Sequence, residues 1–150
     1  MIPTKLGHAH LKVRDLDRAV AFYTRFFNLK LVERVGSDYA FLTGSDFHHE
    51  LALNTVGVRA GQPSPHAVGL YHIAFEAPDK KAFAQAFKSL VEGGVAVAPV
   101  DHLISWAMYF DDPDGNGLEI YCDTRAERRV ALWQGRNEAL TPERILAQLG

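Results

Sequence analysis

Apolar and polar residues alternate in short runs along most of this chain, and two longer runs instead carry apolar residues at helical spacing. The helical runs follow Asp15 and Asp79, and an aspartate directly before such a run is a typical helix N-cap. Runs with a period of two predict strands. The predicted strands are residues 6–13, 29–35, 39–43, 50–55, 70–76, 95–100, 104–110 and 118–122.

The same order of elements, one strand, one helix and three strands, occurs twice in the chain. Residues 6–11 align with residues 70–75, and residues 51–53 align with residues 118–120. A unit of this length that occurs only twice is typical of a duplicated module and not of a solenoid. In each half we expect the helix to cover one face of a mainly antiparallel sheet, which leaves the other face open.

We therefore predict an α+β fold in which two βαβββ modules, about 5–56 and 69–124, form a half-open barrel around a metal cleft. Both modules would belong to one domain that spans residues 1–150. The Gly, Pro and Ser residues of segment 56–66 indicate a linker between the modules. A helical tail, 125–150, lies outside the repeat. We expect the tail to pack on a sheet edge or on a partner subunit, and we find no candidate chemistry in it.

Composition excludes several classes of partner. A formal net charge of -2 over 150 residues gives no electrostatic signal for binding nucleic acid or an anionic membrane. No apolar run approaches the length of a membrane span, and residues 1–5 lack the apolar core of a signal peptide. The single cysteine, Cys122, rules out an internal disulfide and suits a reducing compartment. We expect a cytoplasmic homo-oligomer that acts on small molecules.

The most informative stretch is residues 106–121, which predicts a strand, a tight turn and a second strand. The turn, Asp112–Gly117, contains a proline that fixes φ and glycines that tolerate positive φ. Glu119 follows in the second strand, between two apolar residues. A carboxylate in such a place is costly to bury unless a cation meets it. Because basic side chains are scarce nearby, a metal ion is a candidate for that cation.

Two histidines share the predicted cleft face with Glu119. The helices should cover the apolar strand positions Ala9, Leu11, Val13, Ile73, Phe75, Leu118 and Ile120. That leaves His8, His72 and Glu119 on the open faces, from three different strands. Two imidazoles and one carboxylate with vacant positions suit a non-haem Fe(II) site, and Mn(II) accepts the same ligands. His10 shares the face of His8, but the repeat pairs His8 with His72.

These residues resemble the vicinal oxygen chelate superfamily, and within it the type I extradiol ring-cleaving dioxygenases. The superfamily resemblance covers about residues 5–124. It rests on the motifs at 7–16 and 21–23, at 71–75, and at 112–119. These motifs are shared by dioxygenases, isomerases and thiol transferases alike.

A narrower dioxygenase signature consists of a His, a spacer, an apolar residue and a Tyr, then Asp-Pro-x-Gly and a Glu. In this chain it is matched by His102, Met108, Tyr109, residues 112–115 and Glu119. The resemblance implies a single-domain extradiol dioxygenase that uses Fe(II) to insert O₂ into a catechol.

Carried over to this sequence, the resemblance implies that His8, His72 and Glu119 are the iron ligands. It also implies that Tyr109 and His102 donate hydrogen bonds to a bound catecholate. A structural tyrosine that lines the sheet and a solvated loop histidine are the alternative interpretations of these last two residues.

The resemblance also implies an acid–base histidine at residues 48–52, which match a His-His-x-Leu-Ala stretch whose second His has that role. Strict alternation of side chains along the strand, with Leu51 facing the helix, would instead place His48 and Glu50 on the cleft face. Because the first residues of strands often carry bulges that break alternation, we predict His49, with His48 as the alternative. An imidazole at either place can take and return a proton near neutral pH.

Two other functions fit the same fold. A glyoxalase-like isomerase would need a fourth ligand in the first module, at the position equivalent to Glu119. The repeat puts Ala52 there, and Glu50 could replace it only with a register shift. A drug-binding protein of the bleomycin-resistance type would have the fold without metal ligands, and the presence of His8 and His72 together with Glu119 argues against it.

Overall fold

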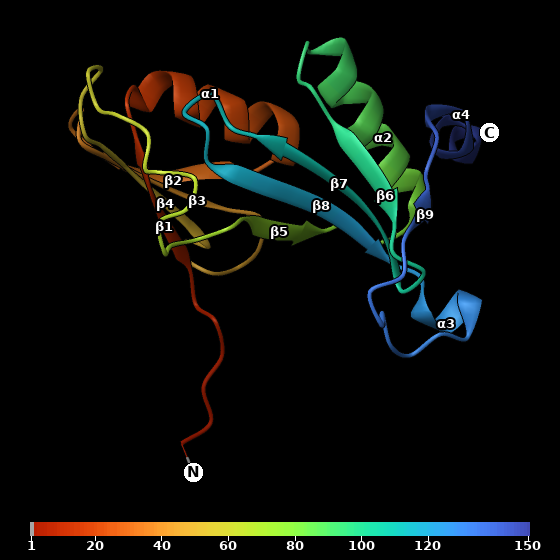
Figure 1. Ribbon diagram of the computed structural model, residues 1–150. Coiled ribbons are helices and arrows are strands. Elements are labelled where there is room, and N and C mark those ends of the chain that lie inside the picture. Colours follow the sequence, from red (N-terminus) through yellow and green to blue (C-terminus); the bar gives the residue numbers. More distant parts are fainter. Residues whose placement is uncertain (1) are drawn as a thin grey trace. The chain divides into compact units, whose positions relative to one another are not determined.

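A computed structural model describes residues 2–150 as two compact units (Figure 1). The first unit ends at Val68 and also includes the turn Asp112–Asn116. The second unit comprises residues 69–111 and 117–150. Among the described residues, no helix combines the length and the apolar character that a bilayer crossing requires.

The first unit is a four-stranded sheet covered by one helix, α1 (Leu16–Phe27). The strand order is β1-β4-β3-β2, with β1 and β4 parallel and the other pairs antiparallel. Asp15 caps α1 as predicted, because its carboxylate accepts a hydrogen bond from the backbone N–H of Arg18. The strand bounds are β1 Ala9–Val13, β2 Lys30–Val35, β3 Tyr39–Thr43 and β4 Leu51–Thr55.

The turn Asp112–Asn116 is held within this first unit by side chains of α1 and by Arg14, two residues before the helix. The hydroxyl of Tyr23 donates to Asp112 Oδ2 at 2.8 Å, and burial together with this carboxylate raises the pKa of Tyr23. Asp114 Oδ1 accepts from Arg18 at 2.7 Å and from Arg14 at 3.3 Å. Asp112 and Asp114 are both buried, so these donors compensate carboxylates that would otherwise be costly to bury.

The second unit repeats the plan with α2 (Lys80–Glu92) over a five-stranded sheet (Figure 1). The strand order is β5-β8-β7-β6-β9. Asp79 caps α2 by accepting from the backbone N–H of Ala82 at 2.7 Å. The strand bounds are β5 Ile73–Glu76, β6 Ala98–Asp101, β7 Ser105–Asp111, β8 Gly117–Asp123 and β9 Glu138–Ala139.

The register of the strands confirms the repeat. Ala9 pairs with Leu51 in the first sheet, and the equivalent Ile73 pairs with Leu118 in the second. Each sheet is mainly antiparallel, as predicted, with one parallel pair between its first and last module strands. The α+β fold with two βαβββ modules is therefore confirmed, and each module forms its own sheet.

Several predicted strand bounds were wrong. β1 begins at Ala9 and not at residue 6, and β5 begins at Ile73 and not at residue 70. β6 occupies Ala98–Asp101 in place of 95–100. In β1 and β5 the apolar alternation begins before the residues that find a partner strand, so the sequence pattern starts these two strands too early. His8 and His72 consequently lie one residue before their strands.

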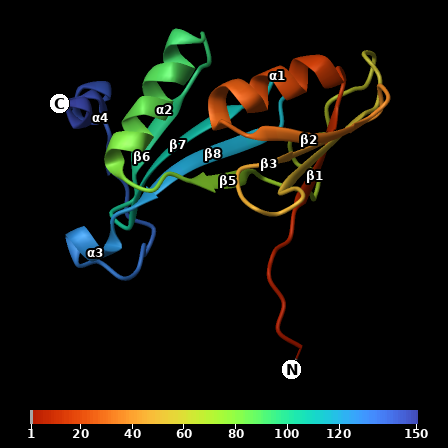
Figure 2. The same ribbon diagram turned by 180° about the vertical axis from the view of Figure 1, so that it is seen from behind.

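The C-terminal tail packs on the edge of the second sheet, one of the two places expected for it. β9 pairs with β6. The helix α4 (Pro142–Leu146) packs against α2, and Figure 2 shows the two helices side by side. A short helix, α3 (Arg125–Arg128), and a 3₁₀ turn, Ala147–Leu149, complete the tail. β9 was not predicted because two residues are too few to show alternation.

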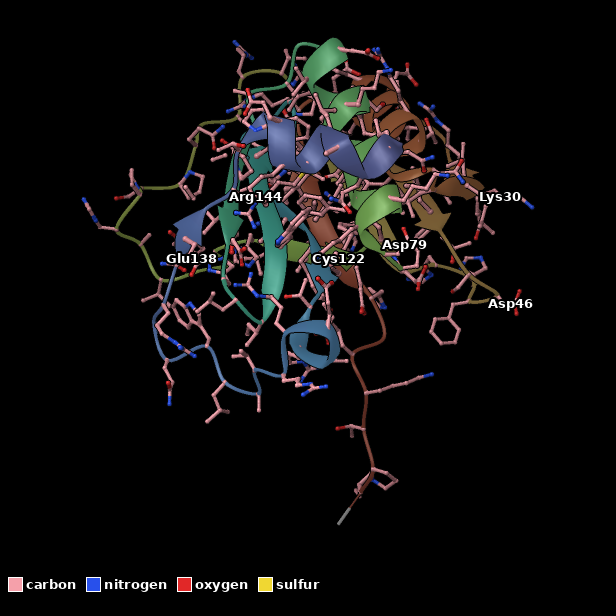
Figure 3. All side chains as sticks on the ribbon, turned by 90° about the vertical axis from the view of Figure 1, so that its right-hand side faces the viewer. Lys30, Asp46, Asp79, Cys122, Glu138 and Arg144 are labelled. Carbon is pink, nitrogen blue, oxygen red and sulfur yellow. The ribbon has the colours of Figure 1, made fainter. Side chains whose placement is uncertain are left out.

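Asp101 at the end of β6 ties the tail to the sheet. Its side chain is wholly buried and accepts hydrogen bonds from Arg128 at 2.6 Å, from Arg144 at 3.2 Å and from the backbone N–H of Leu103 at 2.8 Å. Arg144 of α4 and Glu138 of β9 are labelled in Figure 3. Burial alone would raise the pKa of Asp101, but the Leu103 N–H and the two guanidinium groups outweigh it, and the pKa is lowered.

Candidate metal centre and pocket

His72 and Glu119 meet on the open face of the second sheet. Leu118 and Ile120 are buried on the α2 side of β8, so alternation turns Glu119 to the opposite face. His72 directly precedes β5, the neighbour of β8, and its Nε2 lies 2.9 Å from Glu119 Oε2. The structure thus brings together two of the predicted ligands, the imidazole of His72 and the carboxylate of Glu119.

These two side chains fit a metal ion. Glu119 is only 8% exposed, and the nearby His72 Nδ1 is buried with no hydrogen-bond partner among residues 2–150. A buried imidazole nitrogen without a partner and a buried carboxylate are both costly unless something compensates them. Imidazole and carboxylate together are the donor types that Fe(II) and Mn(II) accept.

Tyr109 and His102 extend this cluster. Tyr109 lies directly opposite Glu119 in the β7–β8 ladder, and its hydroxyl is 2.8 Å from His102 Nε2. Burial, then the adjacent carboxylate of Glu119, raises the pKa of Tyr109 to about 12. A phenol with this pKa keeps its proton at neutral pH and can act as a hydrogen-bond donor. The two predicted catalytic residues of this unit therefore lie beside the two predicted ligands.

The first unit brings His8 and His49 together. Their ring centroids are 4.5 Å apart, and His49 also packs edge-on against Phe41. Partial desolvation, followed by the neighbouring rings of His8 and His48, lowers the pKa of His49. His10 instead contacts Tyr39.

His48 contacts His49 and Glu33. Its Nδ1 is 2.9 Å from His49 Nδ1, and its Nε2 is 3.1 Å from Glu33 Oε2. The argument from alternation, which favoured His48, does not hold because residues 44–50 form bends and β4 starts only at Leu51. The contact of the His49 ring with the predicted ligand His8 favours His49 over His48, and the acid–base role stays a prediction.

The position equivalent to Glu119 in the first unit is Ala52. Ala52 pairs with His10 in the β1–β4 ladder as Glu119 pairs with Ala74 in the β5–β8 ladder. The carboxylate of Glu50 accepts hydrogen bonds from the backbone N–H of Gly44 at 2.8 Å and from the hydroxyl of Thr43 at 3.3 Å. Glu50 is thus engaged in its own turn, which argues against its use as a fourth ligand.

The predicted ligands divide between the two units, with His8 in the first and His72 and Glu119 in the second. Within the described residues of either unit, no three His, Cys, Asp or Glu side chains gather as a metal site. The three-residue set therefore stays a prediction that rests on the sequence and on the His72–Glu119 pair.

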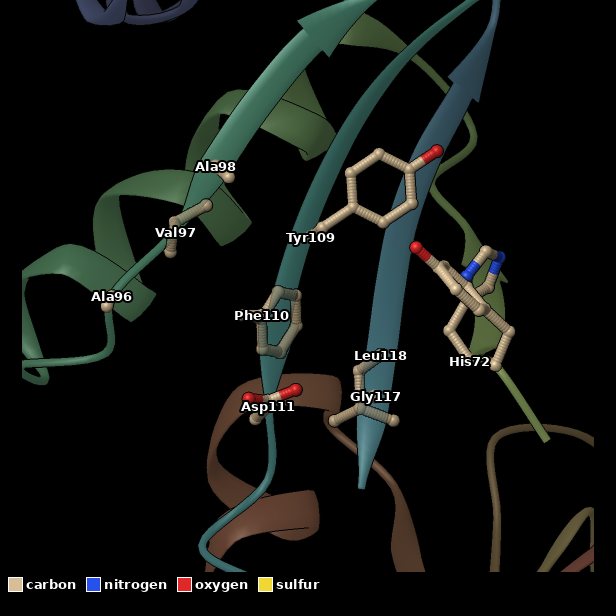
Figure 4. A pocket seen from close by; sticks show the side chains of 10 residues that line it. His72, Ala96, Val97, Ala98, Tyr109, Phe110, Asp111, Gly117 and Leu118 are labelled. Atoms are coloured by element: carbon tan, nitrogen blue, oxygen red, sulfur yellow. The ribbon is translucent and has the colours of Figure 1, made fainter. Parts of the chain in front are cut away.

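A pocket opens beside this pair in the second unit, with a cavity of about 530 Å³. Figure 4 shows the side chain of Tyr109 projecting from β7, with His72 at the same pocket. Its lining contains no Lys or Arg among the described residues, and its one charged member other than histidine is Asp111. The lining residues are Tyr71, His72, Ala96, Val97, Ala98, Tyr109, Phe110, Asp111, Gly117 and Leu118.

A family model, that of the Glyoxalase/Bleomycin resistance protein/Dioxygenase superfamily, matches residues 5–120. The chain belongs to this superfamily. The match covers both modules and confirms the resemblance inferred from the motifs around His8, His72 and Glu119. Members of the superfamily bind divalent metal ions, and one solved relative contains Mn(II).

Among individual relatives, the catechol-2,3-dioxygenase of Bacillus subtilis (strain 168) is 34% identical over 135 residues, which are 90% of this chain and 46% of that protein. The chain therefore spans about half the length of that relative. The glutathione transferase FosA of Serratia marcescens is 29% identical over 126 residues, 84% of this chain and 86% of that protein.

A solved structure extends the comparison of the fold. A mutant of the fosfomycin resistance protein FosX from Listeria monocytogenes, complexed with Mn(II) and 1S,2S-dihydroxypropylphosphonic acid, has a TM-score of 0.65 at 22% identity. The alignment covers 85% of this chain and 96% of that one. At this identity the likeness supports the superfamily fold alone.

Gly117 is a position where this superfamily member needs a glycine for packing. A Cβ added there would collide with the backbone oxygen of Tyr71, directly before His72. We expect Gly117→Ala to displace the 71–72 segment, to lower stability by about 1–3 kcal/mol and to weaken Mn(II) binding. Thermal unfolding and calorimetric titration with Mn(II) measure the two effects.

Gly69→Ala is the matched control for this prediction, because a Cβ there meets no atom within 4 Å. We expect it to leave both measurements unchanged. A Gly117→Ala protein that binds Mn(II) as tightly as the wild type would show that the backbone contact does not position His72.

Sequence reasoning missed two tail residues that contact the site. Asn137 Oδ1 lies 2.5 Å from His102 Nδ1, and Trp133 packs edge-on against the His102 ring. Both follow His102 by 31 residues or more in the sequence, outside the repeat and outside any motif. No signal in the sequence could have found them, since only the β6–β9 pairing brings them to His102.

Proposed function

We propose that this protein is an Fe(II)-dependent extradiol dioxygenase that cleaves the ring of a catechol. The observation that carries the proposal is the cluster on the second sheet, where the Tyr109–His102 hydrogen-bonded pair lies beside the His72–Glu119 pair. A hydrogen-bonded phenol and imidazole beside a metal centre can donate to, and accept protons from, a bound substrate. The similarity to the Bacillus dioxygenase supports the same function.

The metal would be held by His72 and Glu119 of the second unit and by His8 of the first. When bound, Fe(II) would supply the positive charge that binds both substrate oxygens and the redox chemistry that engages O₂. Both atoms of O₂ would enter the ring-opened product, so the reaction needs no external reductant. Mn(II) is the alternative ion, because it accepts the same ligands.

The side chains of the protein would orient the substrate and handle its protons. The Tyr109 phenol, aimed at the face that carries Glu119, would donate a hydrogen bond to an oxygen of the ring as negative charge develops there. Before the substrate binds, His102 would hold that phenol in place through its Nε2. His49, beside His8 in the first unit, would take up a substrate proton and return it later.

The pocket favours a substrate without a negatively charged substituent. Its lining contains no Lys or Arg among the described residues, and Asp111 would repel an anion. Ala96, Val97 and Ala98 leave room for an apolar ring substituent. We therefore expect alkyl- or halogen-substituted catechols to be better substrates than catechols that carry a carboxylate.

A metal-dependent transferase or isomerase is the second candidate, because the chain matches 86% of the length of the FosA relative but only 46% of the dioxygenase. The pocket disfavours it, since among the described residues its lining has no Lys or Arg that could assist a metal ion in binding a phosphonate or the carboxylates of glutathione. Ala52, in the place of a fourth ligand, also argues against a glyoxalase-like isomerase.

The test is anaerobic reconstitution with Fe(II) or Mn(II), followed by exposure to O₂ and a panel of catechols. We expect a yellow ring-fission product and consumption of one O₂ per catechol, with methylcatechols preferred to carboxylated ones. No product from any catechol, together with turnover of a hemithioacetal or of fosfomycin with a thiol, would overturn the proposal.

A further inference from the structure

The tail places an asparagine against His102 by strand register. β9 pairs antiparallel with β6, so that Glu138 lies opposite Asp101. The next position of the ladder brings Asn137, just before β9, opposite His102, just after β6. The amide Oδ1 of Asn137 lies 2.5 Å from His102 Nδ1. This contact lies in the second unit, together with Tyr109 and Glu119.

Trp133 determines which way the Asn137 amide faces. The indole Nε1–H can only donate, and it lies 3.2 Å from Asn137 Oδ1 and 2.9 Å from the backbone oxygen of Arg136. If the amide were reversed, its NH₂ group would face the indole N–H, and two donors would meet. The atom that His102 contacts is therefore an acceptor, and His102 Nδ1 must carry a proton.

This assignment decides between two hydrogen-bond arrangements of the cluster. The phenol of Tyr109 has one proton and two possible acceptors, Glu119 and His102 Nε2. If the phenol donated its hydrogen bond to Glu119, the phenol oxygen would have to accept one from His102 Nε2. A neutral His102 would then carry its proton on Nε2 and present an unprotonated Nδ1 to Asn137. The acceptor oxygen of Asn137 disfavours that arrangement, so in the substrate-free protein the phenol donates its proton to His102 Nε2 and the carboxylate of Glu119 is left available.

We propose that Asn137, oriented by Trp133, is a positioning residue that fixes the tautomer and ring orientation of His102. The C-terminal tail is then part of the reaction site. The expected effect on catalysis rests on the proposed dioxygenase function, whereas the assignment of the His102 tautomer is independent of that function. The orientation is rigid because Asp101, adjacent to His102, is bound by Arg128 of α3 and by Arg144 of α4.

The first measurement is the tautomer of His102 in the metal-free protein. Histidine labelled with ¹⁵N is observed by long-range ¹H–¹⁵N correlation about two pH units above the ordinary histidine pKa of about 6.5. His102→Gln assigns the signals. We expect a proton on Nδ1 in the wild type, the same in Asn137→Asp, which keeps an acceptor, and a shift toward the Nε2–H tautomer in Asn137→Leu.

Two further variants separate this role from a merely structural one. Trp133→Phe keeps a ring against His102 but removes the N–H, and we expect the same shift toward Nε2–H. Leu132→Ala changes an exposed residue of the same loop and should have no effect. An Nε2–H tautomer in the wild type, or an unchanged tautomer in Asn137→Leu, would overturn the proposal.

The second measurement is steady-state turnover of a catechol by the Fe(II) protein. We expect Asn137→Leu to lower kcat by about 10–100-fold with little change in KM, and Asn137→Asp to recover part of the loss. If the tautomer shifts as expected but the wild type cleaves no catechol, the proposed function fails and the positioning role stands. If the wild type is active and Asn137→Leu equals it in kcat, the positioning role fails.

Discussion

Replacing Glu119 with glutamine is expected to abolish metal binding and catechol cleavage while leaving the fold intact. The amide is nearly the same size but has no negative charge, and Glu119 is the anionic ligand in the predicted set. We expect the affinity for Mn(II) or Fe(II) to fall by more than the roughly 10–100-fold that is typical when residues around a metal ligand are changed. Calorimetric titration of the metal-free protein measures this.

The metal-free Glu119→Gln protein should be at least as stable as the metal-free wild type. Glu119 is buried beside His72 and forms no ion pair with a Lys or Arg among the described residues, so neutralising it removes a desolvation cost. Thermal unfolding without metal should therefore give an unchanged or higher Tm. Addition of Mn(II) should raise the Tm of the wild type only, because a ligand that binds the folded state stabilises it.

Glu76→Gln is the matched control. Glu76 is an exposed carboxylate of β5 in the same sheet, and its partner is the hydroxyl of Tyr121 at 3.2 Å. We expect it to bind metal and to cleave catechols like the wild type. Metal affinity of Glu119→Gln equal to that of the wild type would refute the assignment of Glu119, and with it the proposed centre.

The second large effect is expected on stability, from Asp101→Ala. Asp101 is wholly buried and is the shared acceptor of Arg128, Arg144 and the Leu103 N–H. Breaking a buried ion pair by removing one partner typically costs about 3–5 kcal/mol. We expect a loss near the lower end of this range, because Arg128 and Arg144 are partly exposed and can be hydrated. Urea unfolding measures the difference.

Glu138→Gln provides the control for Asp101→Ala. Glu138 pairs with the same Arg128 at 3.5 Å, but it is exposed, so its loss should cost less than about 1 kcal/mol. Equal destabilisation by the two variants would contradict the view that burial makes the Asp101 contacts important.

The contribution of Asp101 should also depend on pH. Its pKa in the folded protein lies below the ordinary value, so the folded state binds its proton less readily than the unfolded state. The stabilisation is fully present above the unfolded pKa of about 3.9 and is lost as pH falls through the lower folded pKa. The difference in unfolding free energy between wild type and Asp101→Ala should therefore shrink below about pH 4.

Much of the fold follows from the sequence, because helices, caps and strand pairing leave local signals. The two aspartates at positions 15 and 79 cap their helices as predicted, and the alternation of apolar residues identified all eight module strands. The internal alignment of the two halves also predicted that Ala52 takes the place of Glu119, which the strand registers confirm.

Within the candidate site, the sequence by itself determined which residue types could share the open face of a sheet, and it led to His72 and Glu119. Alternation is a local rule, and it holds where a strand is paired. It fails at residues 44–50, where no strand forms, and this is why alternation gave the wrong environment for Glu50 and could not choose between His48 and His49.

Only the tertiary structure decided how the tail contributes. Asn137 and Trp133 have no periodicity, repeat or motif around them, and their partner His102 lies more than thirty residues earlier. They reach it because β9 adds to the edge of β6 and Asp101 binds two tail arginines. Such contacts are made by chain segments that meet only after folding, so no local pattern in the sequence records them.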